Sequence, residues 1–370
     1  MQRLPILALA GAALLAGLWA GLVRLGWTLP PLQAVWVAGH GPLMISGFLG
    51  TVISLERAVA LVPLARSRLP YAAPLLAALG GLALLMGLPA PVGPLLLSGG
   101  SLALAAIFME INRRQLNWPH AVMGLGAVAW LAGNLLWWLG WPIFQVLPWW
   151  MGFLVLTIAG ERLELSRVLR PRPAAMAAFV AVIVLCLAGL ALSIGWPALG
   201  VRVTGVGLLA LGGWLLRFDI ARRTARRGQI GLTRYIALCL LPGFGWLIVG
   251  GGLWIVLAER FNAGPWYDAM VHTVLVGFVF SMIFGHAPII LPAVTGLALP
   301  YRRAFYCHLV LLHTGLVLRV IGDLAPAPLW RQWGGLLNVT AIVLFLLVSG
   351  ASALRARRPL MPQRSNATVE

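Results

Sequence analysis

Residues 174–195 read AAMAAFVAVIVLCLAGLALSIG, a run of apolar and small residues without a charged side chain. A helix needs about 20 apolar residues to cross the hydrocarbon core of a bilayer. Lipid offers no hydrogen-bond partner to a strand edge, so a membrane span must be a helix or part of a closed barrel. Barrel strands alternate apolar and polar residues over about ten positions, and this stretch does not. It therefore predicts a transmembrane helix.

Similar stretches recur along the whole chain. Of its 370 residues, 61% are hydrophobic and only 10% are charged, whereas soluble domains carry about 25% charged residues. The sequence therefore predicts an all-α polytopic membrane protein, with residues 1–370 forming a single transmembrane domain. We expect about twelve spans, at residues 5–27, 34–62, 70–89, 93–111, 119–139, 142–165, 174–195, 197–217, 232–257, 266–294, 302–322 and 330–354.

The distribution of arginine predicts the topology. The formal net charge is +18, which a nucleic-acid-binding protein could also carry. The arginines, however, occupy the loops after the second, fourth, sixth, eighth and tenth spans, whereas the loops after the first, third, fifth and seventh carry no charge. The positive-inside rule then places the even-numbered loops and both termini in the cytoplasm. We expect a multi-pass protein of the cell inner membrane, with the lipid bilayer rather than nucleic acid as its partner, and a short, basic, disordered tail at 355–370.

The sequence carries few motifs of other chemistries. Each of the three cysteines falls within an apolar span and none has a CxxC partner, so neither a structural disulfide nor a thiolate metal site is expected. The phosphate-loop, nucleophile-elbow and HExxH patterns are missing from the sequence. A hydrolase therefore has no support.

Three spans share an internal pattern. Gly47-Phe48 is followed by Glu56-Arg57, with the glutamate nine positions after the glycine. Gly152-Phe153 is followed at the same spacing by Glu161-Arg162, and Gly277-Phe278 by His286. The three spans are four helices apart and run in the same direction. The pattern predicts three diverged four-helix units around a pseudo-threefold axis, with equivalent residues at equivalent depths.

His40 and His272 are the first candidates for function, because ionisable groups inside a bilayer are costly and often functional. Each lies about six residues into a span that enters from the outer face, hence about 9 Å deep at 1.5 Å per residue. Two imidazoles at one depth on different helices can provide opposed axial ligands to a haem iron. The alternative is that each imidazole is hydrogen-bonded by nearby hydroxyl or carbonyl groups and has only a structural role.

A second group of candidates lies in the inner half of the bundle. His286, His308, Glu56 and Glu161 have comparable predicted depths and could form a metal site, a second haem site or a proton path. For the glutamates, the alternative is an ion pair with the arginine that follows each of them, Arg57 or Arg162, at the membrane interface.

These residues resemble two known groups of membrane proteins. Histidines on the second and tenth spans are similar to the low-spin haem ligands of haem-copper oxidase subunit I, a fold of twelve helices with both termini inside. Residues 40–48, HGPLMISGF, and 272–277, HTVLVG, more closely resemble the corresponding helices of the NnrS family. Proteins of that family contain haem and copper in the membrane and are associated with nitric oxide stress. The resemblance implies a b-type haem held by His40 and His272.

The chain departs from both groups at several positions. Pro42 stands where a second histidine of the second span is expected. The oxidase copper site needs one histidine on the sixth span and a pair on the seventh, but the sixth span offers Gln145 and Glu161 and the seventh has no histidine. Dioxygen reduction at a haem–copper centre is therefore disfavoured, and so is copper as a cofactor.

Three functional hypotheses follow. The leading one is a haem-binding membrane protein with a redox or nitric oxide related role, served by a respiratory-chain electron donor. The second is a proton-coupled secondary transporter, because twelve spans, internal repeats and buried Glu and His residues also fit such a carrier. The third is an assembly factor for a respiratory complex. The sequence leaves open whether the protein is an enzyme.

Overall fold

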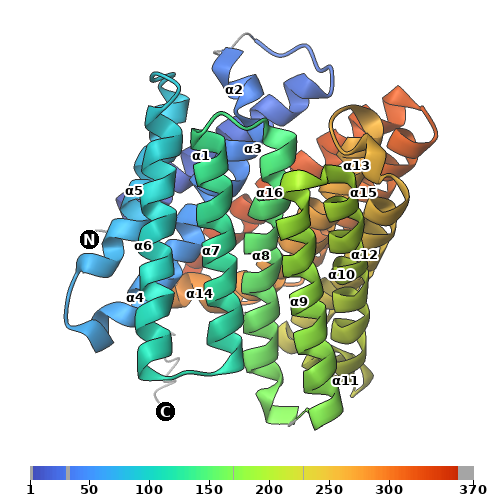
Figure 1. Cartoon of the computed structure of the whole chain (residues 1–370). Coiled ribbons are helices and arrows are strands. Elements are labelled where there is room, and N and C mark those ends of the chain that lie inside the picture. The colour runs from blue at the N-terminus through green and yellow to red at the C-terminus, as the bar shows by residue number, and fades with distance from the viewer. Residues whose placement is uncertain (1–2, 31–33, 170, 228, 357–370) are drawn as a thin grey trace, which may run out of the picture.

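The computed structural model describes residues 3–30, 34–169, 171–227 and 229–356 (Figure 1). Within these ranges the chain forms helices and no strand. Eleven of the helices are long and apolar enough to cross a membrane, and a shorter apolar helix lies at Leu69–Leu85. The prediction of an all-α polytopic membrane protein is confirmed.

The long helices begin and end close to the predicted span boundaries. Short turns rich in Pro and Gly separate many of them, since these two residues interrupt a helix. The uninterrupted spans are α1 (Arg3–Arg24), α5 (Ala72–Leu85, preceded by a short turn), α6 (Val92–Arg114), α7 (Trp118–Trp138), α8 (Ile143–Ser166), α9 (Pro173–Gly195), α10 (Pro197–Phe218), α12 (Leu232–Val256), α15 (Phe305–Leu324) and α16 (Pro328–Ala356).

The second and tenth spans are interrupted. The second consists of α2 (Ala34–Ala38), α3 (His40–Pro42), the π-helical η1 (Leu43–Gly50) and α4 (Thr51–Ala65). The tenth consists of α13 (Gly264–His272), the π-helical η5 (Thr273–Phe280) and α14 (Ser281–Thr295). Long π-helical stretches are rare and often accompany functional sites. The helix α11 (Ile220–Arg226) is an additional short element between two spans.

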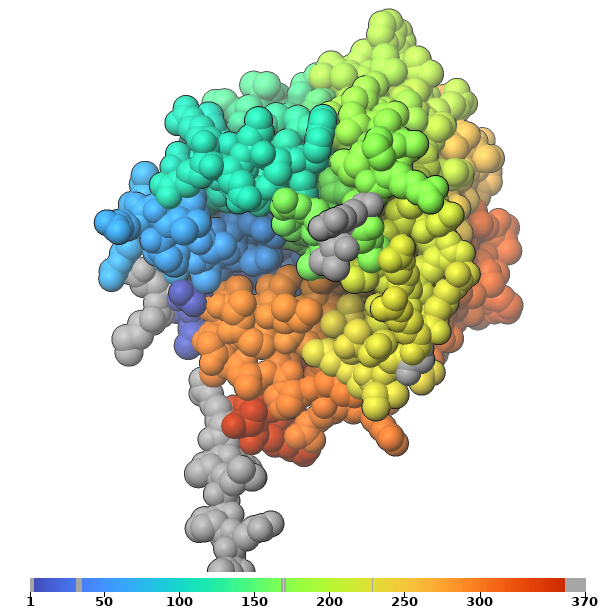
Figure 2. Space-filling model, turned by 90° about the horizontal axis from the view of Figure 1, so that it is seen from below, coloured from blue at the N-terminus to red at the C-terminus, as the bar shows by residue number. Residues whose placement is uncertain are grey.

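The two π-helical segments support the predicted repeat. Gly47-Phe48 and Gly277-Phe278 occupy the same positions, fifth and sixth, of η1 and η5. The equivalent pair in the sixth span lies in regular α-helix within α8. Seen from one end of the bundle, the chain passes around the molecule from blue through green and yellow to the orange segment at the bottom (Figure 2).

Packing places α8 and the tenth span at the centre of the bundle. Within the most apolar stretch of each long helix, the share of buried residues is largest for these two, at 72% and 67%. Helices adjacent in the chain pack in pairs, such as α5 with α6, α7 with α8, and α15 with α16. The α6–α7 and α8–α9 connections lie at the same end of the bundle as α11 (Figure 1), so several arginine-rich segments gather there. The predicted tail at 355–370 lies outside the described residues beyond Ala356.

Candidate functional site

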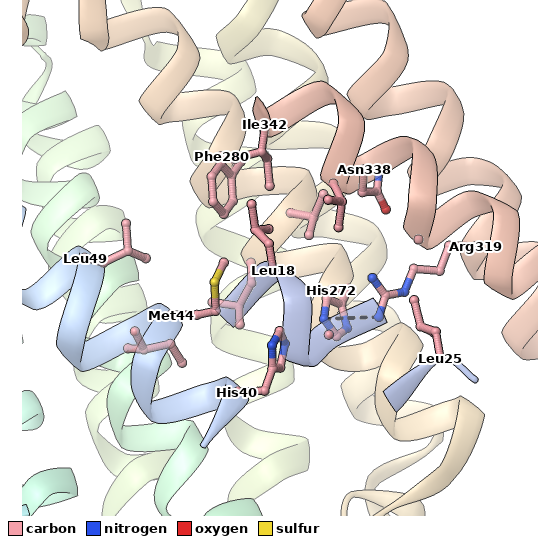
Figure 3. Close-up of a pocket in the computed structure, with 16 residues that line it drawn as sticks. Leu18, Leu25, His40, Met44, Leu49, His272, Phe280, Arg319, Asn338 and Ile342 are labelled. Carbon is pink, nitrogen blue, oxygen red and sulfur yellow. Dashed lines mark hydrogen bonds between the residues drawn. The ribbon is translucent and has the colours of Figure 1, made fainter. Parts of the chain in front are cut away.

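The structure brings His40 and His272 together. Their ring centroids lie 6.3 Å apart and their ring planes differ by 26°. The first ring comes from the start of the second span and the second from the end of α13, immediately before η5. Figure 3 shows the two rings side by side, with Met44 on one side and Arg319 on the other.

The chain around His40 fixes the orientation of its ring. Nδ1 lies 2.7 Å from the carbonyl oxygen of Gly17 in α1. A carbonyl oxygen only accepts, so Nδ1 donates and Nε2 is left with its lone pair in the neutral ring. A Cβ atom at Gly21 would lie 3.0 Å from Cε1 of His40. The glycine one turn further along α1 therefore leaves the space that the ring occupies.

His272 has the same arrangement at its Nδ1, which donates to the carbonyl oxygen of Asp268 over 2.9 Å. Its Nε2 accepts a longer hydrogen bond of 3.3 Å from Nη2 of Arg319. The guanidinium of Arg319 in turn donates to both carboxylate oxygens of Asp268, over 2.7 Å and 2.8 Å. Both imidazoles thus present Nε2 as an acceptor, and both are held at Nδ1 by a backbone carbonyl.

A cavity of about 590 Å³ lies beside the two rings. Its lining combines apolar side chains, among them Met44 and Leu275, with three arginines at positions 24, 319 and 331. A smaller, mainly apolar cavity of about 60 Å³ also touches both histidines and continues to Phe280 and Ile342. Both cavities thus border the two histidines, one of them mainly apolar and the other with arginines in its lining.

The geometry fits a metal held between two imidazoles. A metal ion about 2 Å from one nitrogen of each ring places the ring centroids roughly 6 Å apart, in agreement with the observed 6.3 Å. A donor bond from Nδ1 to a backbone carbonyl is the usual outer-shell contact of a metal-bound histidine. At His272, such a metal would have to replace the 3.3 Å hydrogen bond from Arg319 to Nε2.

A second polar cluster connects three of the long spans. Arg57 in α4 forms ion pairs with its neighbour Glu56 and with Glu161 in α8. Arg162, next to Glu161, donates two hydrogen bonds, of 2.7 Å and 2.8 Å, to Asp219. Both partners of this second pair are almost completely buried, with 2% and 0% of their side-chain surface exposed.

His286 belongs to the same polar cluster. We name this group the inner cluster, because the predicted topology places it in the inner half of the bundle. Its Nε2 accepts from Nη1 of Arg162 over 3.1 Å, and its Nδ1 donates to the carbonyl oxygen of Met282 over 2.7 Å. The residues at the repeated position nine after the glycine, Glu56, Glu161 and His286, are therefore joined through Arg57 and Arg162. Arg57 of the first repeat reaches Glu161 of the second, and Arg162 of the second reaches His286 of the third. In the third repeat the corresponding position after His286 is Ala287, so there is no third arginine at this place.

The sequence suggested ion pairs of Glu56 with Arg57 and of Glu161 with Arg162, and the structure contains only the first. Glu56 pairs with Arg57 as expected. Glu161 instead pairs with Arg57 of another helix, because Asp219 and His286 occupy the guanidinium of Arg162.

His308 lies in different surroundings from His286. Its Nε2 shares a hydrogen bond of 2.9 Å with the hydroxyl of Tyr235, and rings of Phe284, Phe305 and Phe345 pack around it. Its buried Nδ1 has no hydrogen-bond partner among the described residues. The structure thus places His286 among charges and His308 among aromatic rings. In the described part of the chain, no group of three or more His, Cys, Asp or Glu side chains is placed to hold a metal ion.

Several residues around His272 and Arg162 were not predicted from the sequence. Asp268 and Arg319 hold His272, and Asp219 holds Arg162. Arg331 and the buried Asp323 form a further ion pair of 2.8 Å near the outer cavity. A signal was present for Arg319, since a charged side chain within an apolar span marks a functional position.

Comparison with known proteins identifies a family for this chain. A search of curated proteins finds no relative of this chain. The model of a family described as a domain of unknown function, DUF8744, matches residues 3–354. Because the match covers nearly the whole transmembrane bundle, the chain belongs to the DUF8744 family.

Proposed function

We propose that this chain is a haem-binding integral membrane protein, similar to the NnrS family, with a redox or nitric oxide related role. His40 and His272 hold a b-type haem through their Nε2 atoms. The observation that supports this most directly is the pair of rings 6.3 Å apart, each oriented by a carbonyl at Nδ1 and both lining one cavity. When bound, the haem supplies one-electron chemistry at its iron.

The remaining residues of the cavity have defined tasks in this proposal. The side chains of Met44 and Leu275 provide an apolar surface for the macrocycle. Arg24 lines the same cavity and can pair with a carboxylate of a b-type haem, because guanidinium groups bind carboxylates well. Arg319 and Arg331 also line the cavity and are already ion-paired, with Asp268 and Asp323 respectively. Asp268 keeps Arg319 in place through two hydrogen bonds.

The proposal also assigns an orientation and a partner. The positive-inside rule places the arginine-rich connections in the cytoplasm of a cell whose inner membrane holds the protein. The haem then lies near the outer face, where a respiratory-chain donor can deliver electrons. Within the inner cluster, Glu56 and Glu161 form the proposed proton path, and Arg57 holds both of them in place.

Haem absorbance of the purified protein tests this function. We expect a b-type spectrum and a matching pyridine haemochrome after expression with sufficient haem. The variants His40→Ala and His272→Ala should each lose the low-spin spectrum. A colourless protein, or spectra unchanged in both variants, would overturn the proposal.

The inner cluster favours a second candidate, a proton-coupled secondary transporter. Buried carboxylates and histidines that face one another across helices are common in proton-coupled carriers, and Glu161 is joined to Arg57 across two helices. Proton-driven flux in proteoliposomes made from haem-free protein, lost in Glu161→Gln, would support this candidate over the first.

A further inference from the structure

A separate cavity of about 540 Å³ lies at the end of the bundle that carries α11. It lies between the connection from α8 to α9 and the segment where α10 passes into α11; Figure 2 shows this end of the molecule, with the first segment in green beside the second in yellow. Its lining contains five arginines, at positions 172, 217, 222, 223 and 226. Leu169, Pro171 and Phe218 add an apolar side.

The charge of this cavity is not neutralised from within. None of the five arginines forms an ion pair with a carboxylate in the described ranges of the chain. The single acidic residue of the lining, Asp219, directs both oxygens to Arg162, and one of them also accepts from the backbone N–H of Ala221 over 2.7 Å. Its negative charge is therefore committed to the inner cluster.

We propose that this cavity binds a phosphate-bearing anion. Guanidinium groups bind phosphate oxygens in a planar, bidentate manner, which suits sites where several arginines converge. A scattered set of surface arginines would satisfy the positive-inside rule equally well, but it would not require a concave site. The anion comes from a lipid headgroup or from a soluble phosphate. Basic pockets between transmembrane helices commonly take anionic headgroups, and the apolar side of the cavity suits the start of a lipid tail.

Binding of defined probes to the full-length protein tests this site. One arm titrates inorganic pyrophosphate into the detergent-solubilised protein by calorimetry. The other compares bound lipid by native mass spectrometry after incubation with phosphatidylglycerol, cardiolipin or phosphatidylcholine. Saturable binding in either arm, with preference for anionic over zwitterionic lipid, is expected. Binding only of anionic lipid identifies the headgroup as the source, and binding of pyrophosphate identifies a soluble anion.

Two matched variants separate a site from general charge attraction. The triple variant Arg222→Gln, Arg223→Gln, Arg226→Gln removes three charges from the cavity. The control Arg68→Gln, Arg113→Gln, Arg303→Gln removes three exposed charges elsewhere. We expect the first to weaken binding roughly tenfold or more and the second to leave it nearly unchanged, because only the first removes charge-assisted hydrogen bonds to the anion.

The result that overturns the proposal is equal binding by both triple variants, or no saturable binding of any probe to the unmodified protein. Monodisperse elution and an unchanged unfolding temperature without ligand establish that each variant is folded. If the cavity variant does not fold, the single change Arg217→Gln, with Arg303→Gln as its control, answers the same question. The site is independent of the haem proposal, so either can fail while the other stands.

Discussion

The imidazole rings of His40 and His272 lie 6.3 Å apart with their planes within 26° of parallel, although the residues belong to the second and tenth spans. Each donates from Nδ1 to a backbone carbonyl, of Gly17 and Asp268 respectively. Each is also next to a π-helical segment, which begins at Leu43 in one span and at Thr273 in the other. The two spans thus present their histidines to one cavity in the same way.

The first prediction concerns the two histidines themselves. We expect His40→Ala and His272→Ala each to abolish the low-spin haem spectrum, because each removes one of two axial ligands. His120→Ala is the control, since His120 lies at the start of α7 and its ring hydrogen-bonds to the nearby backbone carbonyl of Gln115. Optical spectra and pyridine haemochromes of the three purified variants provide the measurement. Loss of haem in His120→Ala to the same extent would contradict a specific role for the pair.

The second prediction concerns the space behind His40. A side chain at Gly21 meets the His40 ring at 3.0 Å, whereas nothing lies within 4 Å of a Cβ at Gly11 on the same helix. We expect Gly21→Val to displace the ring and lower haem affinity roughly 10-fold to 100-fold, the usual effect of disturbing the contacts behind a metal ligand. Gly11→Val should bind haem like the unmodified protein. Haem titration into apoprotein distinguishes the two, and equal affinities would argue against the assigned ligand.

The third prediction concerns the buried pair of Arg162 and Asp219. Asp219→Ala leaves a guanidinium without its carboxylate in the core, and removal of one partner of a buried pair costs about 3–5 kcal/mol. Glu110→Ala removes a partner of the exposed pair Glu110–Arg114, where about 0–1 kcal/mol is expected. Unfolding by sodium dodecyl sulfate in mixed micelles measures both. Similar losses in the two variants would show that the inner pair contributes no more than a surface pair.

The fourth prediction concerns the end of the first π-helical segment. A Cβ at Gly50 would lie 2.2 Å from the indole of Trp130, and this indole donates to Ser46 over 3.0 Å. We expect Gly50→Ala to destabilise the protein by about 1–3 kcal/mol through overpacking.

Gly213→Ala is the matched control for this change. Gly213 lies within α10, and nothing lies within 4 Å of a Cβ at that position. Since alanine favours helix over glycine, this variant should be equal to the unmodified protein or up to about 1 kcal/mol more stable. A stable Gly50→Ala protein with unchanged unfolding would contradict the close packing of Trp130 against the second span.

The inner cluster illustrates where sequence reasoning succeeded and where it did not. The repeated spacing of Glu56, Glu161 and His286 after a glycine was visible in the chain, and the structure joins these residues through two arginines. The sequence predicted Glu56 as a partner of Arg57, but it predicted neither Glu161 as the second partner of Arg57 nor Asp219 as the partner of Arg162. Asp219 lies in what the sequence presents as a basic loop, and its full burial against Arg162 depends on how α10 ends beside α8.

The sequence by itself determined the membrane spans, because the bilayer demands about 20 apolar residues per helix regardless of tertiary context. It also predicted that His40 and His272 lie at similar depths. Only the tertiary structure decided that the two rings meet, that His286 and His308 do not share their surroundings, and that Arg319 reaches Asp268. Depth follows from position along a helix, whereas contact depends on the rotation and packing of separate helices, which side chains far apart in the chain determine together.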